Sequence, residues 1–259
     1  MARELLVVSG GHPYEAEPFA AMLASLEGWT VTHLLHPEAE RLVGEGCADA
    51  ADVILFYDMP GYTFGDGQVT ARAPSEAFRR AIMAHFEAGR GAVAMHHALA
   101  GWALWPEWSE LLGGRFLYQP GELRGQPQLD SGYRHDVTYS AQVVADHPVT
   151  RGVPPEFSVT DELYLARVFA DDIQPLIRAR HDFTRDNFFS AAAAAVAGRM
   201  FDNAGWEHPD GSDCVAWIKP ALNARLVYLQ FGDGPATYAN PHVRKVLANA
   251  LDFVATAPT

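Results

Sequence analysis

The residues best suited to chemistry in this sequence follow short apolar runs, where β-strands are expected to end. Four such places carry glycine, histidine or aspartate: Gly10-Gly11-His12, Asp58-Met59-Pro60-Gly61, His96-His97 and Gly232-Asp233-Gly234. Ligands of open parallel sheets bind beyond the carboxyl ends of the strands, because loops and helix N-termini converge there. We therefore expect these groups to meet at one edge of a sheet.

The histidine pair is the most specific of the four. It follows the expected strand 91–95 and precedes a segment of helical character, an arrangement typical of a nucleophile elbow with His96 in place of Ser or Cys. An imidazole can act there as a general base, a proton shuttle or a metal ligand. Neighbours on a turn diverge, so we expect His96 to face the site in preference to His97, which remains a candidate for substrate binding.

The glycine pair before His12 lets backbone N–H groups face a cavity, where Gly11 and His12 could bind an anion or an oxyanion. A glycine-rich turn whose histidine only caps a helix is the alternative, and the sequence leaves both open. The spacing matches neither a dinucleotide fingerprint nor a phosphate loop.

Asp161 and Glu162 are adjacent carboxylates close to Tyr164. If buried, such a pair needs an imidazolium, an arginine or a metal as partner, whereas on a turn it would be solvated. Trp102 begins a group of three tryptophans that could stack on a sugar ring, although packing of a helix on a sheet is the commoner role.

Composition limits the class of protein. The chain has 259 residues and a net charge of −13, with 32 acidic and 19 basic side chains, which disfavours a nucleic-acid partner. The two cysteines, Cys47 and Cys214, can form at most one disulfide, as expected in a reducing compartment. The apolar run at Leu5–Val8 is too short for a signal peptide or a membrane span. We expect a cytoplasmic protein without a membrane partner.

The elements that must position these groups alternate between short β-branched runs and amphipathic segments. This pattern predicts an α/β fold with a doubly wound, mostly parallel sheet and helices on both faces. Less regular alternation predicts an inserted antiparallel excursion, and no linker divides residues 1–259, so we expect one domain. The expected strands are 5–8, 30–35, 53–57, 91–95, 134–145, 156–169, 215–219 and 225–230, and the clearest helices are 74–86, 102–112 and 241–255.

Several segments follow one another in an order that resembles the ThuA-like (trehalose utilisation) family. They are GAVAMHHALAGW, WSELLGGRF, DHPVTRGVPPEFSVTDELY and VAWIKPALNARLVYLQFGDGPATYANPHVRKVLANALDFVA. The resemblance covers nearly the whole chain. It implies a flavodoxin-like sheet similar to that of class I glutamine amidotransferases, a site at its carboxyl edge and a role in carbohydrate utilisation.

The resemblance also implies site residues. His96 falls at the family's histidine, where true amidotransferases have cysteine, and Asp161, Glu162 and Tyr164 match a T-D-E-x-Y motif. Gly232 matches the first residue of a G-H turn, but Asp233 replaces the histidine of many members, and a carboxylate there could still bind a metal or a sugar hydroxyl. Tyr238 belongs to the Y-x-N-P helix start. The segment 181–211 is longer than the family leads us to expect, which suggests a lid or an oligomer contact.

The leading hypothesis is an enzyme that acts on a disaccharide such as trehalose or its 3-keto derivative, as a hydrolase or isomerase, with His96 as general acid/base and Glu162 as its partner. A second version has His12, His96 and Glu162 holding a divalent metal such as zinc. Neither cysteine follows the strand before His96, which excludes a cysteine-dependent glutamine amidotransferase. The alternative is a non-catalytic sugar-binding or regulatory protein, and the chain could form a homo-oligomer. The expected substrate-binding residues are Gly11, His12, Asp58, His97, Trp102, Asp161, Tyr164, Gly232, Asp233 and Tyr238.

Overall fold

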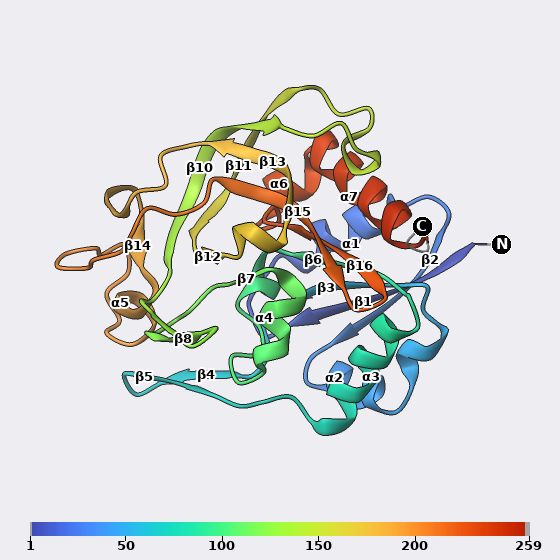
Figure 1. Cartoon of the computed structure of the whole chain (residues 1–259), viewed down its shortest axis with the longest axis horizontal. Coiled ribbons are helices and arrows are strands. Elements are labelled where there is room, and N and C mark those ends of the chain that lie inside the picture. Colours follow the sequence, from blue (N-terminus) through green and yellow to red (C-terminus); the bar gives the residue numbers. More distant parts are fainter. Residues whose placement is uncertain (1, 257–259) are drawn as a thin grey trace.

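Five parallel strands form the part of the sheet that carries the expected site. The structure, a computed structural model, describes residues 2–256 (Figure 1). The strands lie in the order β2 (Trp29–Leu35), β1 (Arg3–Gly10), β3 (Val53–Asp58), β6 (Ala92–Met95) and β16 (Ala224–Leu229). This is the doubly wound, flavodoxin-like order, in which the chain reverses direction across the sheet between β1 and β3.

The antiparallel excursion continues the same sheet. The two strands expected at 215–219 and 225–230 form a hairpin that joins β16 to β15, and the sheet then runs through β13, β10 and β11, with the short β14 also paired to β10. These strands are β15 (Cys214–Ala221), β13 (Gln174–Arg180), β10 (Gly132–Val143), β11 (Glu156–Leu165) and β14 (Phe189–Ser190). β10 and β11 therefore extend beside the parallel part and can deliver side chains to its carboxyl edge.

Helices cover both faces of the parallel strands (Figure 1). On one face lie α1 (Ala16–Ala24), α6 (Pro235–Ala239) and α7 (Pro241–Val254), and on the other α2 (Glu38–Gly44), α3 (Glu76–Glu87) and α4 (Pro106–Leu112). α7 begins at the cap Asn240, whose side chain accepts the N–H groups of His242 and Val243. Its apolar face is buried along its whole length, at Val243, Val246, Leu247, Ala250, Leu251 and Val254.

Smaller elements complete the edges. They are the hairpins β4 (Tyr62–Gly65)–β5 (Gln68–Ala71) and β8 (Gly121–Leu123)–β9 (Gln126–Gln128), the pair β7 (Gly114–Arg115)–β12 (Arg167–Val168), the helix α5 (Ala191–Ala195), and 3-10 turns at Cys47–Ala50, His96–Leu99, Pro148–Thr150, Ala170–Asp172 and Arg185–Asn187. The helix expected from Trp102 begins only at Pro106, because Trp102 itself has a left-handed backbone (φ 54).

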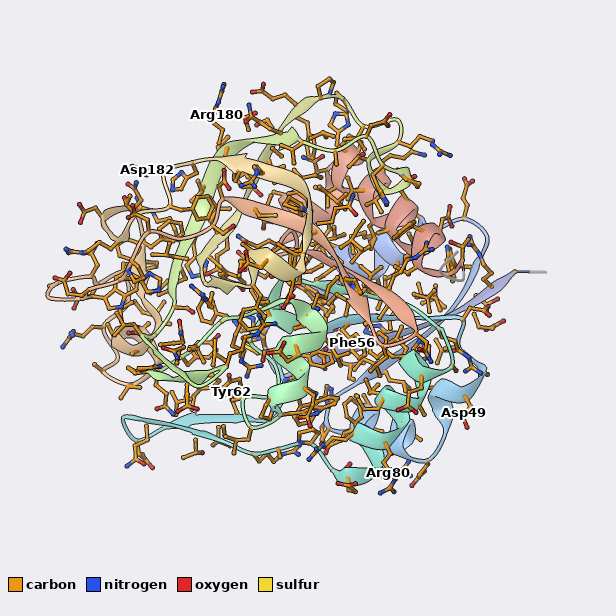
Figure 2. All side chains as sticks on the ribbon, in the orientation of Figure 1. Asp49, Phe56, Tyr62, Arg80, Arg180 and Asp182 are labelled. Atoms are coloured by element: carbon orange, nitrogen blue, oxygen red, sulfur yellow. The ribbon has the colours of Figure 1, made fainter. Side chains whose placement is uncertain are left out.

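Side chains fill the space between the layers. Figure 2 labels Phe56 on β3, which is fully buried, and Asp49, Arg80 and Arg180 on the outer elements, which are exposed. Within residues 2–256, no helix has both the length and the apolar character needed to cross a membrane.

Candidate active site

His96 occupies a strained turn directly after β6, as the elbow pattern predicts. Its φ of 44° is left-handed, which is unfavourable for a residue with a Cβ and is found most often where function requires it. The side chain is completely buried. Its Nδ1 donates to the carbonyl of Gln230 at 2.5 Å, while the hydroxyl of Tyr228 donates to the carbonyl of His96 at 3.1 Å. The ring is therefore fixed, and its Nε2 is directed at the carboxylates.

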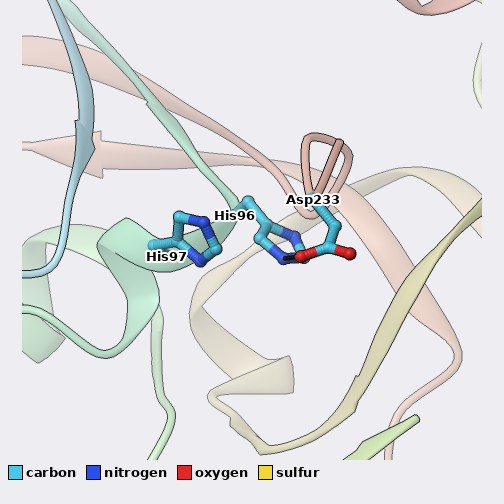
Figure 3. A group of neighbouring side chains, drawn as sticks. All are labelled: His96, His97 and Asp233. Atoms are coloured by element: carbon cyan, nitrogen blue, oxygen red, sulfur yellow. Dashed lines mark ion pairs between the residues drawn. The ribbon is translucent and has the colours of Figure 1, made fainter. Parts of the chain in front are cut away.

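Two carboxylates meet this Nε2. Glu162 Oε2 lies 3.1 Å away and Asp233 Oδ1 lies 3.6 Å away. In Figure 3 the His96 ring lies between His97 and Asp233. The structure thus brings together His96 and Glu162, the expected catalytic pair, with Asp233 from the glycine-rich turn after β16.

Asp161 and Glu162 are adjacent on β11, so their side chains leave opposite faces of the strand. Asp161 accepts the backbone N–H groups of Gly232 and Asp233, both at 2.9 Å, and so fixes the turn that carries Asp233. Both carboxylates are buried, at 4% and 5% exposure. They form a buried, partnered pair and not a solvated turn.

The charges of the cluster depend on these contacts. Burial by itself would lower the pKa of His96, but the hydrogen bonds with Asp233 and Glu162 raise it well above the usual value. Burial would raise the pKa of Asp233, but hydrogen bonds with His135 and His96 lower it strongly. Burial raises the pKa of Asp161 to about 6, against the charge of His96 and the two backbone donors. At neutral pH we therefore assign an imidazolium at His96 and carboxylates at Asp161 and Asp233.

His97 and His12 behave differently from His96. Burial, followed by the charges of His96 and His12, lowers the pKa of His97 well below its usual value, and its ring nitrogens face the hydroxyls of Tyr57 (3.4 Å) and Tyr164 (3.3 Å). The ring of His12 lies on that of His97 with centroids 3.9 Å apart. Burial lowers the pKa of His12, and its Nδ1 donates to the carbonyl of Pro13 at 2.8 Å, which leaves Nε2 with a free lone pair.

Gly11 is required by this packing. A Cβ on Gly11 would lie 2.3 Å from the carbonyl oxygen of Met59, at a backbone φ of +84° that favours glycine. The loop after β1 can therefore approach the loop after β3 only with glycine at this position, and this approach brings His12 to the site.

A pocket of about 310 Å³ opens above the cluster. Its polar floor consists of His12, His135 and Glu162, and its walls are mainly apolar or aromatic. The lining residues are Gly11, His12, Pro13, Met59, Phe64, Phe116, Tyr118, Tyr133, His135, Glu162, Tyr164, Ala191, Ala194, Ala195 and Met200. Part of the segment 181–211, including α5, therefore forms one wall, in keeping with the covering role considered for it.

His135 is a site residue outside the set expected from the sequence. It lies at the start of β10, where the pairing with β11 shifts by one residue between Arg134 and Val137. Its Nδ1 is 3.4 Å from Glu162 Oε1 and 3.8 Å from Asp233 Oδ2. Hydrogen bonding to Asp233, which outweighs partial burial, raises the pKa of His135. Strict alternation along β10 would have assigned it to the same face as Val137 and Tyr139.

Several expected site residues lie elsewhere. Asp58 is fully buried and bonded to His36 Nε2 at 2.9 Å, and Trp102 is fully buried with its ring 5.4 Å from that of Phe78; neither lines the pocket. The structure therefore places both side chains in the core and away from the pocket, because Asp58 at the end of β3 and Trp102 beyond the turn after β6 both contact His36.

Three other expected contacts are indirect. The hydroxyl of Tyr57 donates to the carbonyl of Gly232 at 2.6 Å and lies 2.6 Å from that of Tyr238. Asp161, Gly232 and Tyr238 together support the site from beneath. None of these three residues is among those that line the pocket.

The expected metal set of His12, His96 and Glu162 is also not assembled. Among residues 2–256, the groups whose potential ligand atoms lie within 4.8 Å of one another are His96, His97 and Asp233, and His135, Glu162 and Asp233. His12 belongs to neither, because its ring stacks on His97.

Comparison with known proteins agrees with this architecture. A ThuA-like protein from Parabacteroides merdae matches with a TM-score of 0.69 and 14% identity over 99% of this chain and 91% of its own. One from Bacteroides uniformis matches with a TM-score of 0.61 and 19% identity over 98% and 91%. A cytoplasmic protein of Salmonella typhimurium matches with a TM-score of 0.56 and 10% identity over 96% and 99%. No curated protein sequence matches the chain. The model of the ThuA family, described as trehalose utilisation, matches residues 5–254, and the chain belongs to this family.

Proposed function

We propose that this protein is a cytoplasmic enzyme that transfers a proton at a sugar carbon next to a carbonyl group, as an isomerase of a keto sugar would. A 3-keto derivative of a disaccharide such as trehalose is the proposed substrate. The observation that carries the proposal is the contact of 3.1 Å between His96 Nε2 and Glu162 Oε2 at the floor of the pocket. The description of the family as trehalose utilisation supports a carbohydrate.

The geometry suggests different roles for Glu162 and His96. Glu162 lines the pocket, whereas His96 is fully buried behind it. Glu162 would accept the proton from the sugar and return it, and the His96 imidazolium would balance the charge of the carboxylate and fix its orientation. His96 is then a positioning residue instead of the general base expected from the sequence. His12 Nε2, with its free lone pair, would accept a hydrogen bond from a sugar hydroxyl.

Deuterium exchange tests the proposal directly. In D2O, the wild-type protein should incorporate deuterium at the carbon next to the keto group of a 3-keto-glucoside or 3-keto-trehalose, as followed by NMR. Glu162→Gln should slow this exchange about 10²–10⁴-fold, because the amide cannot accept the proton. The control variant is Glu156→Gln, which changes an exposed glutamate on the same strand. This variant should catalyse deuterium exchange at the wild-type rate.

The alternative, a sugar-binding protein without catalysis, predicts a different outcome. The wild-type protein would then gain thermal stability from the sugar, because a ligand that binds the folded state raises the unfolding midpoint. It would nevertheless show no exchange above the buffer rate. That result would refute the enzymatic proposal.

A further inference from the structure

We propose a divalent-metal site at the floor of the pocket, formed by His135 Nδ1 and Glu162 Oε1, which line the pocket, and by Asp233 Oδ2 beside them. The inference deepens the proposed function because it concerns the same pocket, but metal binding by these residues does not require turnover. One imidazole and two carboxylates are a ligand set suited to Zn²⁺ or Mn²⁺.

The spacing of the three side chains supports a shared ion. His135 Nδ1 lies 3.4 Å from Glu162 Oε1 and 3.8 Å from Asp233 Oδ2, and ligand atoms of all three residues lie within 4.8 Å of one another. With metal–ligand bonds of about 2.0–2.2 Å, two ligand atoms of a tetrahedral ion are about 3.3–3.6 Å apart. The separations from His135 are therefore close to those of a formed coordination shell.

The second oxygen of each carboxylate is held by His96. Nε2 of His96 approaches Glu162 Oε2 at 3.1 Å and Asp233 Oδ1 at 3.6 Å, so the two carboxylates each offer one oxygen to His96 and the other to His135. Ligands in metal sites are characteristically oriented in this way by hydrogen bonds from a second layer of residues. His96 is in turn fixed by the carbonyl of Gln230, and the backbone of Asp233 by Asp161.

The side toward the pocket remains open. The side chains of His135 and Asp233 are 35% and 28% exposed, and His135 and Glu162 both line the pocket. Catalytic zinc sites characteristically combine three protein ligands with an open position for water or substrate. A sugar carbonyl or hydroxyl in the pocket could fill that position.

The other candidate group, His96, His97 and Asp233, is less suitable (Figure 3). Both ring nitrogens of His97 face tyrosine hydroxyls, at 3.3 and 3.4 Å, and Nδ1 of His96 already donates to Gln230. Both histidines are also buried, at 0% and 2% exposure, and neither lines the pocket. We therefore assign the ion to the side of His135.

A bound ion would change the role of Glu162. With Oε1 on the metal, Glu162 would be a ligand, and the ion would polarise the sugar carbonyl as a Lewis acid. His12 Nε2 would then be the group with a free lone pair at the floor, and the proton from the carbon would pass to it. The charge on the resulting enolate would be stabilised by the ion.

Titration calorimetry with Zn²⁺ and Mn²⁺ tests the site without any substrate. Protein treated with chelator and dialysed should bind one ion per chain saturably, with a matching rise in thermal stability. His135→Ala and the nearly isosteric Asp233→Asn should each weaken binding about tenfold or more. Circular dichroism establishes that both variants are folded. His208→Ala and Asp210→Asn, a histidine and an aspartate outside the group, are the controls and should bind like wild type.

The outcomes separate this inference from the proposed function. Absence of saturable binding by the wild type, or equal binding by His135→Ala and Asp233→Asn, overturns the metal site. If chelator-treated protein still catalyses deuterium exchange at the full rate, the Lewis-acid role of the ion fails and the proposed function stands, while calorimetry alone decides whether the site binds metal. If one ion binds through these residues but no keto sugar exchanges, the metal site stands and the proposed function fails.

Discussion

At the scale of single residues, the site depends on how closely the backbone can approach His96. The strained φ of His96 is held by the hydrogen bond from Nδ1 to Gln230, and Gly232 leaves room beside the Cβ of His96. Gly232 has a φ of +133°, and a Cβ there would lie 3.2 Å from Met95 Cε and 3.4 Å from His96 Cβ. The glycine after β16 thus maintains the elbow after β6.

The substitution Gly232→Ala should therefore be costly. We expect a loss of about 2–3 kcal/mol in the free energy of unfolding, from backbone strain and from displacement of His96. The matched variant is Gly125→Ala, where φ is +72° but no atom lies within 4 Å of the added Cβ, so only strain of about 1 kcal/mol is expected. Urea denaturation of both proteins measures the difference, and equal losses would disprove a role for contact with His96.

At the scale of secondary-structure elements, a β-bulge in β10 supplies the residue that completes the site. On the pocket side of the bulge, Tyr133 and His135 face the cavity, while beyond it Tyr139 and Ala141 belong to the core under the other face of the sheet. A bulge changes which face a strand presents, and bulges are common beside active sites. One strand can in this way serve both the core and the pocket.

The bulge also makes a prediction about Asp136. This exposed residue has a φ of 55°, which aspartate tolerates, glycine prefers and β-branched residues resist. Asp136→Val should lower the free energy of unfolding by about 1–2 kcal/mol, whereas Asp136→Gly should remain within about 0.5 kcal/mol of wild type. Because the side chain is exposed, the comparison by urea denaturation isolates the backbone term. Tolerance of valine would show that the bulge relaxes in solution.

At the scale of the whole molecule, histidines with lowered and with raised pKa values make the free energy of unfolding greatest at an intermediate pH. Burial lowers the pKa of His85 to about 4, and its Nε2 donates to the carbonyl of Gly91 while Nδ1 has no partner. His97 has a lowered pKa for the same reason. His96 and His135 have raised pKa values because carboxylates face them.

The signs follow from proton linkage. Below about pH 6.5 the unfolded chain protonates histidines that the folded state keeps neutral, so stability falls as pH falls. Above about pH 6.5 the folded state retains protons on His96 and His135 that the unfolded chain loses, so stability falls as pH rises through their raised pKa values. The raised pKa of Asp161, about 6, makes stability fall as pH rises from about 4 to 6, which partly offsets the acid limb, whereas the lowered pKa of Asp233 affects stability only below about pH 4.

We therefore expect the free energy of unfolding to be greatest near pH 6.5. Between about pH 6.5 and 5, His85 alone should account for a loss of about 1.5 kcal/mol. The variant His85→Gln, distant from the pocket, should flatten this acid limb and leave the alkaline limb unchanged. Urea denaturation across the pH range measures both limbs, and stability that rises steadily from pH 6.5 to 9 would contradict the assigned charge of His96.

Sequence alone determined the parallel part of the fold and the edge of the sheet at which the candidate site lies. Strand and helix periods repeat locally, and the carboxyl ends of parallel strands must share an edge, so the order of residues suffices to assign His12, His96 and Asp233 to it. The sequence also required a partner for Asp161 and Glu162 if these were buried, and the structure supplies backbone donors for one and an imidazole for the other.

Only the tertiary structure decided which side chains reach the pocket. Asp58 and Trp102 turn into the core, where both side chains contact His36, and His135 enters the pocket through a bulge that breaks the period-two pattern. Such outcomes depend on contacts between segments far apart in the chain, for example His96 with Gln230 and Glu162. Local periodicity contains no information about those contacts, because it records which face a residue occupies and not what the opposite segment places there.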